Sequence, residues 1–271
     1  ANNLRSKTLL LLNFLLFKET LRILHFNNLS LNAILMVSTS GNSGMMKNSN
    51  LNLKNITSKE KRNLVKNVFT EVSKSYDFMN DLMSFGLHRL WKIQFCNFID
   101  YSSKKKILDL AAGSGDLTKI ICENFNNCDV TLIDSNKKML DEARKKLSKY
   151  KLDFIQSFAE NLPFKKNTFD YVICAFGVRN FTDMDKALSE SYRTLKSKGK
   201  FLCLEFSKPN NMPFKMAFKI YGKIIPKMGK VFANNENAYK YLIESIKSFP
   251  DQEKFSNILQ KHKFKNIECY D

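Results

Sequence analysis

Short apolar runs alternate along the chain with stretches in which apolar residues recur at helical spacing. Runs of strand length lie at 106–110, 130–134, 153–156, 169–176, 200–206 and 267–270. Stretches with three- and four-residue apolar spacing lie at 118–125, 138–149, 185–195 and 252–261. Strands that alternate with helices need crossover connections. The sequence therefore predicts an α/β fold with a doubly wound, mainly parallel sheet.

A helical region is expected before the first strand and another after the fifth. Ser58 can cap a helix whose apolar positions are three or four residues apart, namely Leu64, Val65, Val68, Phe69 and Val72. The main domain is predicted at 57–271. It would hold an N-terminal helical lid at 57–100 and a helical insertion at 209–250. The apolar, basic-flanked part of that insertion could line a tunnel or lie on a membrane surface, or form an ordinary core helix.

The first 45 residues differ from the rest in their charge. They are rich in Leu and carry one acid, Glu19, against Arg5, Lys7, Lys18 and Arg22. A basic, acid-poor, Ser-bearing segment is typical of an organelle transit peptide. We expect mitochondrial targeting and a segment dispensable for chemistry, with secretory entry or a non-functional extension as alternatives. The composition of residues 46–56 is typical of a linker.

Composition argues against some classes of protein but does not identify a binding partner. The net charge of +18 is compatible with nucleic acid, with anionic lipid or with a solvated basic surface. No apolar run reaches the roughly 18–20 residues of a membrane span, so an integral membrane protein is not expected. The six cysteines form no C-x-x-C pair. We therefore expect buried reduced thiols in a reducing compartment, with no metal site and no disulfide framework.

The turn after the first predicted strand indicates a nucleotide-like ligand. Gly113 and Gly115 stand between a strand and a helix, where a ligand must approach the backbone closely. A dinucleotide fingerprint would have a third glycine or alanine at Thr118. Asp116 would repel a pyrophosphate but tolerate a cationic ligand, and Asp134, at the end of the second strand, can accept hydrogen bonds from ribose hydroxyls. These features favour S-adenosylmethionine and a class I methyltransferase.

Longer segments resemble the ubiquinone/menaquinone biosynthesis C-methyltransferases. YDFMNDLMSFGLHRLW (76–91) is similar to one signature of that family, and YRTLKSKGKFLCLEFSKP (192–209) to another. Residues 159–188 and 229–252 resemble the same family, so the likeness covers about 60–271. The transit-like leader favours the coenzyme Q branch, which methylates 2-methoxy-6-polyprenyl-1,4-benzoquinol, over methylation of demethylmenaquinol. A non-catalytic subunit of a quinone-biosynthesis complex is the alternative from another class.

The resemblance implies roles for particular residues. It places Arg179, Asn180 and Tyr76 at the substrate as catalytic residues. Arg179 would stabilise phenolate charge or orient a water, because arginine is a poor base, and a surface salt bridge is the alternative. The residues implied for S-adenosylmethionine are Gly113, Ser114, Gly115, Asp134, Phe158, Ala159 and Ala175.

This chain departs from the family pattern at several positions. Phe158 stands where an Asn usually contacts adenine, Ala175 replaces a Ser, and Ser114 keeps the hydroxyl of a Thr. The family's last strand, which enters the sheet antiparallel, has no counterpart before Asp271, so a gap beside the fifth strand is expected.

The resemblance also implies partners and a location. We expect peripheral contact with the anionic inner mitochondrial membrane on its matrix side, a quinone-biosynthesis complex, and a homodimer as a further option. Nucleic acid is not expected. The fourth strand ends in Cys174, Ala175, Phe176 and Gly177 rather than in the Asn/Asp-Pro-Pro-aromatic motif of base-amine methyltransferases.

Overall fold

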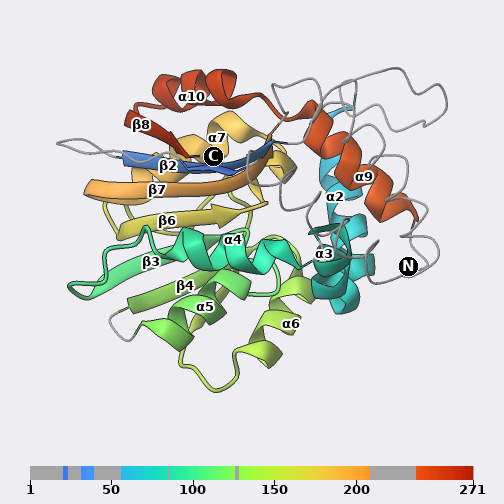
Figure 1. The fold of residues 1–271 in the computed structure, drawn as a ribbon, viewed down its shortest axis with the longest axis horizontal. Helices are drawn as coiled ribbons and strands as arrows, with labels where there is room; N and C mark the ends of the chain where they lie inside the picture. Colours follow the sequence, from blue (N-terminus) through green and yellow to red (C-terminus); the bar gives the residue numbers. More distant parts are fainter. Residues whose placement is uncertain are drawn as a thin grey trace, which may run out of the picture.

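The computed structural model describes residues 21–23, 32–39, 56–84, 86–125, 128–207 and 236–270. Its centre is a sheet in the order β1-β8-β2-β7-β6-β3-β4-β5 (Figure 1). The strands are β1 (Leu21–Ile23), β2 (Asn32–Thr39), β3 (Lys105–Leu110), β4 (Cys128–Asp134), β5 (Asp153–Gln156), β6 (Phe169–Ala175), β7 (Leu195–Ser207) and β8 (Lys265–Tyr270). Apart from β1, which is antiparallel to both of its neighbours, the strands pair in parallel. The predicted α/β class and parallel sheet are confirmed.

Helices flank the sheet and gather at one end of it. They are α2 (Ser58–Val72), η1 (Ser73–Ser75), α3 (Tyr76–Ser84), α4 (Leu87–Cys96), α5 (Asp116–Asn124), α6 (Lys137–Lys146), η2 (Val178–Asn180), α7 (Met184–Thr194), α9 (Glu236–Ser248) and α10 (Gln252–Lys261). In Figure 1, α2, α3 and α9 stand together at the right-hand end of the sheet, away from the helices that cover its faces. Of the predicted insertion at 209–250, residues 209–235 lie outside the described part of the chain.

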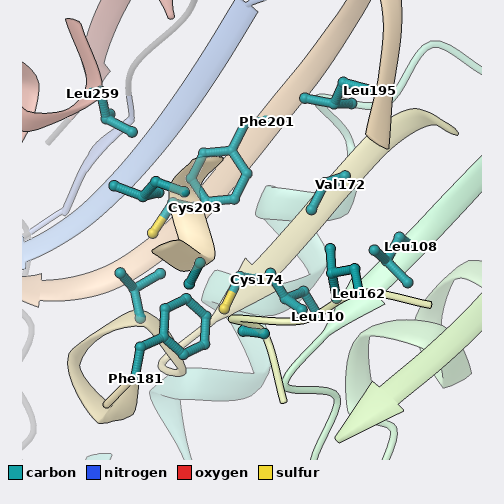
Figure 2. Close-up of a cluster of buried hydrophobic side chains, with 14 of the residues drawn as sticks. Leu108, Leu110, Leu162, Val172, Cys174, Phe181, Leu195, Phe201, Cys203 and Leu259 are labelled. Atoms are coloured by element: carbon teal, nitrogen blue, oxygen red, sulfur yellow. The ribbon is translucent and has the colours of Figure 1, made fainter. Parts of the chain in front are cut away.

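One face of the sheet buries alternate residues of its strands against α7 and α10. Because successive side chains of a strand point to opposite faces, residues two apart share this cluster. Figure 2 shows the strand members Leu108, Leu110, Val172, Cys174, Phe201 and Cys203 together with Leu259 of α10. The intervening residues, such as Ile107 and Ile173, join Trp91 and Phe95 of α4 on the other face. Both faces are covered, which explains the near-continuous apolar character of these strands.

The position beside β7 is filled from an unexpected part of the chain. β2 lies between β7 and β8 and runs parallel to both. An exposed β7 would present a row of unpaired backbone groups, which β2 pairs instead. The gap expected there is therefore closed by a parallel strand, and residues 21–23 and 32–39 of the transit-like segment belong to the sheet. Import by this segment stays a prediction.

The described helices contain no membrane-spanning candidate. None of those in the described ranges is both long and apolar enough to cross a bilayer.

Candidate active site

A cavity of about 210 Å³ opens at the carboxyl ends of β3, β4 and β6. Its floor comes from the residues at those strand ends, and α2 supplies the opposite wall with Arg62, Val65, Lys66 and Phe69. Doubly wound sheets bind ligands at this edge, because the crevices between strand ends and helix starts open there. The lid predicted before the first strand therefore has a place over the site.

Helix α2 begins one residue earlier than the sequence suggested. Thr57 rather than Ser58 is its N-cap, and the Thr57 side chain accepts a bond from the Glu60 backbone while the Glu60 carboxylate accepts one from the Thr57 backbone. This reciprocal pair satisfies two of the N–H groups that a helix start leaves unpaired.

Two strand ends at the cavity hold left-handed residues that are not glycine. Ala111 follows β3 with φ 55°, and Phe176 follows β6 with φ 56°. Both line the cavity. Gly177, next to Phe176, has no room for a side chain, because an added Cβ would lie 2.7 Å from Cys174 Sγ and 2.8 Å from Ala111 Cβ. Such conformations are held by their surroundings and gather at functional sites.

The glycine turn divides its two glycines between binding and packing. Gly113 has φ 56°, lines the cavity, and donates its backbone N–H to Asp134 Oδ2 at 2.9 Å. Gly115 has φ 79° and is the N-cap of α5, where an added Cβ would lie 2.8 Å from Leu147 Cδ1. Gly115 is not among the cavity residues. Gly115 instead allows α5 to pack closely against Leu147, the residue that follows α6.

Asp134 lies at the centre of the site. Its carboxylate accepts backbone N–H bonds from Gly113 and, at 2.8 Å, from Asn136. Burial raises the pKa of Asp134, and the backbone hydrogen bonds oppose this shift. A carboxylate has about four acceptor sites, and the backbone N–H groups occupy only part of them, so ribose hydroxyls can bond to the rest. The residues present therefore fit the ribose of S-adenosylmethionine.

The far end of the cavity suits an adenine ring. Phe158 and Ala159 line it as predicted, and the Phe158 side chain is 39% exposed. The Arg62 guanidinium of α2 lies 4.5 Å from the centre of the Phe158 ring, in cation–π geometry. Phe158 cannot make the hydrogen bond that an Asn would make here. It offers instead an aromatic surface and a contact to Arg62 of α2.

Ser114 does not line the main cavity. Its hydroxyl donates to Asp77 of α3 at 2.9 Å and accepts from Lys146 of α6 at 3.1 Å. It borders a smaller hollow of about 20 Å³ that Tyr76 and Gly113 also line. The predicted cofactor residue therefore lies in a polar network beside the turn.

Asp116 belongs to the same network, and the interpretation of its charge needs correction. Lys92 lies 2.6 Å and Lys146 2.7 Å from its carboxylate oxygens. Burial alone would raise the pKa of Asp116, but these two ammonium groups outweigh it and hold the pKa well below its usual range. Two protein cations already compensate this carboxylate. The charge of Asp116 therefore does not indicate a cationic ligand.

Tyr76 and Ala175 line both hollows. The Tyr76 ring packs against Phe69 of α2 with 5.9 Å between ring centres. Burial raises the pKa of Tyr76, only partly offset by the charge of Lys92. At neutral pH the phenol is protonated, so it acts as a hydrogen-bond donor rather than as a base.

Arg179 is buried and forms an internal ion pair. Its side chain is 4% exposed and its Nη1 lies 2.5 Å from Glu205 Oε1, on a carboxylate that is fully buried. The same Nη1 donates to the Phe176 carbonyl at 2.7 Å, and Nε donates to Ser245 Oγ at 3.3 Å. Arg179 does not line the cavity. The sequence left open a surface salt bridge for Arg179, whereas the ion pair found here is buried in the interior.

Asn180 does line the cavity, and it has a partner that the sequence reasoning missed. Its Oδ1 accepts a hydrogen bond from the hydroxyl of Tyr241 at 2.8 Å, and its Nδ2 donates to the Phe176 carbonyl at 3.2 Å. Tyr241 comes from α9, and no spacing signal connects residues 61 positions apart. The resemblance over 229–252 was the one hint that this helix serves the site.

The described residues form no metal-binding cluster, and two cysteines of the central strands are buried in the core. Within those ranges, no group of three His, Cys, Asp or Glu side chains could hold a metal ion. The six cysteines are free thiols. Burial raises the pKa of Cys174 and of Cys203 well above its usual value, which makes them inert core groups.

Comparisons with known proteins agree with this geometry. The chain matches the profile of the ubiE/COQ5 methyltransferase family over residues 55–271. A ubiquinone/menaquinone biosynthesis C-methyltransferase of Rickettsia bellii is 45% identical over 231 residues, covering 82% of this chain and 93% of that protein. Its counterpart in Rickettsia felis is 46% identical with the same coverage.

The fold itself is also found among solved structures. A SAM-dependent methyltransferase of Thermotoga maritima superposes with a TM-score of 0.50 at 17% identity, covering 73% of this chain and 80% of that one. The sheet order, the cavity at its carboxyl edge and the family match lead to one assignment. The chain belongs to the ubiE/COQ5 methyltransferase family, and it is an S-adenosylmethionine-dependent C-methyltransferase.

Proposed function

We propose that this enzyme methylates a ring carbon of a polyprenyl benzoquinol in coenzyme Q biosynthesis. Its relatives are named for ubiquinone and menaquinone biosynthesis together. The observation that carries the proposal is the cavity in which Asp134, Tyr76 and Asn180 meet. The basic, acid-poor leader favours the coenzyme Q branch over menaquinone.

The reaction replaces a ring hydrogen with a methyl group. Bound S-adenosylmethionine supplies an electrophilic methyl group on its sulfonium. The quinol ring carbon forms the new C–C bond as the S–C bond breaks, and the ring then loses a proton, which leaves S-adenosylhomocysteine and a methylated quinol. Ring electron density rises when a neighbouring hydroxyl ionises, so groups that stabilise a phenolate oxygen accelerate the step.

The residues of the chain contribute orientation and hydrogen bonds to this step. Asp134 and the turn at Gly113 hold the ribose, and Phe158 bounds the adenine end. Asn180 follows β6 in η2, and Tyr76 lines the cavity together with Ala175 at the end of β6, so a phenolate there could accept hydrogen bonds from both. Because Tyr76 keeps its proton at neutral pH, we assign removal of the ring proton to water.

The proposal is tested with the full chain and two acceptors. Purified protein and methyl-labelled donor are incubated with a 2-methoxy-6-polyprenyl-benzoquinol and, separately, with a demethylmenaquinol. We expect label in the benzoquinol product with the higher kcat/KM. A preference for demethylmenaquinol would move the enzyme to the menaquinone branch. Binding of the donor without transfer to either quinol would leave a non-catalytic subunit.

We further propose that the enzyme works in mitochondria, on the matrix side of the inner membrane. The motivation is the charge of residues 1–45. A fluorescent protein fused behind this segment is expected to enter mitochondria in living cells. The control is the same fusion with Arg5, Lys7 and Lys18 replaced by Gln, which should stay in the cytosol. Cytosolic or secretory fluorescence of the unaltered fusion would refute the proposed location.

Peripheral contact with the membrane belongs to the same proposal. Exposed apolar side chains lie on α3 and α4, where Phe78, Leu90 and Ile93 are 49%, 61% and 46% exposed. The net charge of +18 would draw such a surface toward anionic lipid. These features support docking at the bilayer that holds the polyprenyl tail of the substrate.

A further inference from the structure

Tyr241 touches the site without lining it. It lies on α9, is 2% exposed, and donates its hydroxyl hydrogen bond to Oδ1 of Asn180, a residue of the cavity wall. α9 packs against both α2 and η2, so it is anchored on two sides. In Figure 1 it stands beside α2, at the end of the sheet where the cavity opens. Tyr241 is therefore well placed to control the side chain of Asn180 from the protein interior.

The hydrogen bonds of Asn180 determine which way its amide points. The Phe176 carbonyl can only accept, so the amide atom 3.2 Å from it must be the nitrogen. Oδ1 then faces Tyr241, and the phenol is the donor. The second N–H of Nδ2 is then available to a ligand, while Oδ1 is bound to the Tyr241 hydroxyl. Without that hydroxyl, only the bond from Nδ2 to the Phe176 carbonyl would hold the amide, and Oδ1 would lose its partner.

We propose that Tyr241 is a positioning residue that fixes the Asn180 amide, so that an N–H donor is offered to the ring oxygen of the quinol. An N–H donor stabilises negative charge that develops on this oxygen, whereas an amide carbonyl in the same place would repel it. The inference rests on the proposed function. It adds the identity of the donor atom and the group that holds it.

The same helix provides a matched control. Tyr239 is fully buried, and its hydroxyl has no hydrogen-bond partner among the residues described. Tyr239→Phe and Tyr241→Phe therefore remove the same atom from the same helix at similar burial. They differ in whether that atom holds Asn180.

The experiment measures methyl transfer and donor binding on the full chain. Tyr241→Phe is expected to lower kcat by about tenfold, the scale of one lost hydrogen bond, with the Kd for S-adenosylmethionine unchanged. Tyr239→Phe should match the wild type. In an Asn180→Ala background, Tyr241→Phe should cause no further loss, because its target is gone.

A second measurement reports the amide directly and does not need turnover. The side-chain N–H resonances of Asn180, identified by their absence in Asn180→Ala, should shift in Tyr241→Phe and stay in place in Tyr239→Phe. If Tyr241→Phe behaves like Tyr239→Phe in both measurements, or if its kcat loss persists undiminished without Asn180, the positioning role is refuted. A wild type that methylates no quinol while the resonances shift would instead refute the proposed function.

Discussion

Replacing Arg179 with alanine is expected to lower the free energy of unfolding by about 3–5 kcal/mol, because it leaves a buried carboxylate without its partner. Glu205 is fully buried and has Nη1 of Arg179 at 2.5 Å. The same substitution removes a donor from the Phe176 carbonyl, which also holds Asn180. Methylation should fall together with stability, since the loop that carries Asn180 loses its support. Urea denaturation followed by circular dichroism measures the first effect.

Companion variants separate the charge from the geometry. Arg179→Ala combined with Glu205→Gln should recover part of the lost stability, because no charge then remains buried alone. Arg179→Lys keeps the charge but not the planar fork that reaches Glu205, Phe176 and Ser245 together, so it should fall between wild type and Arg179→Ala. If Arg179→Ala kept its full stability and lost only turnover, Arg179 would act on the substrate as the sequence suggested.

The example of Arg179 shows where sequence reasoning reached its limit. Its place after β6 at the ligand edge was predictable, because an apolar run followed by a turn predicts a strand end. Whether its side chain enters the cavity depends on Glu205 and Ser245, which lie 26 and 66 residues away. Pairwise side-chain contacts of this kind leave no periodic signal. The same holds for Lys92 and Lys146 around Asp116.

The fold was more accessible, because its signals are local. A short apolar run such as residues 106–110 predicts a strand, and the glycine turn behind that strand predicts the start of a helix. The partner of β7 was not predictable in this way. Residues 32–39 carry a composition that also suits a transit segment, and only the unpaired edge of β7 explains their place between β7 and β8.

Asp134 combines a predictable role with an energetic cost to the fold. Burial raises its pKa, so the folded protein binds a proton at this carboxyl more tightly than the unfolded chain does. As the pH rises from the ordinary value of an aspartate to that raised pKa, ionisation of Asp134 therefore lowers stability. A carboxylate that costs stability when charged is best explained by what it binds.

Asp134→Ala is expected to weaken S-adenosylmethionine binding by about tenfold to hundredfold, because two ribose hydroxyls lose their acceptor, at roughly 1–3 kcal/mol. The fold should survive. The backbone N–H groups of Gly113 and Asn136 lose a partner, but the desolvated charge disappears as well. Asp129→Ala is the matched control, since it removes a carboxylate from the exposed start of the same strand. Calorimetric titration with the donor measures the affinities, and circular dichroism checks the fold. Equal affinities for Asp134→Ala and Asp129→Ala would place the ribose elsewhere in the cavity.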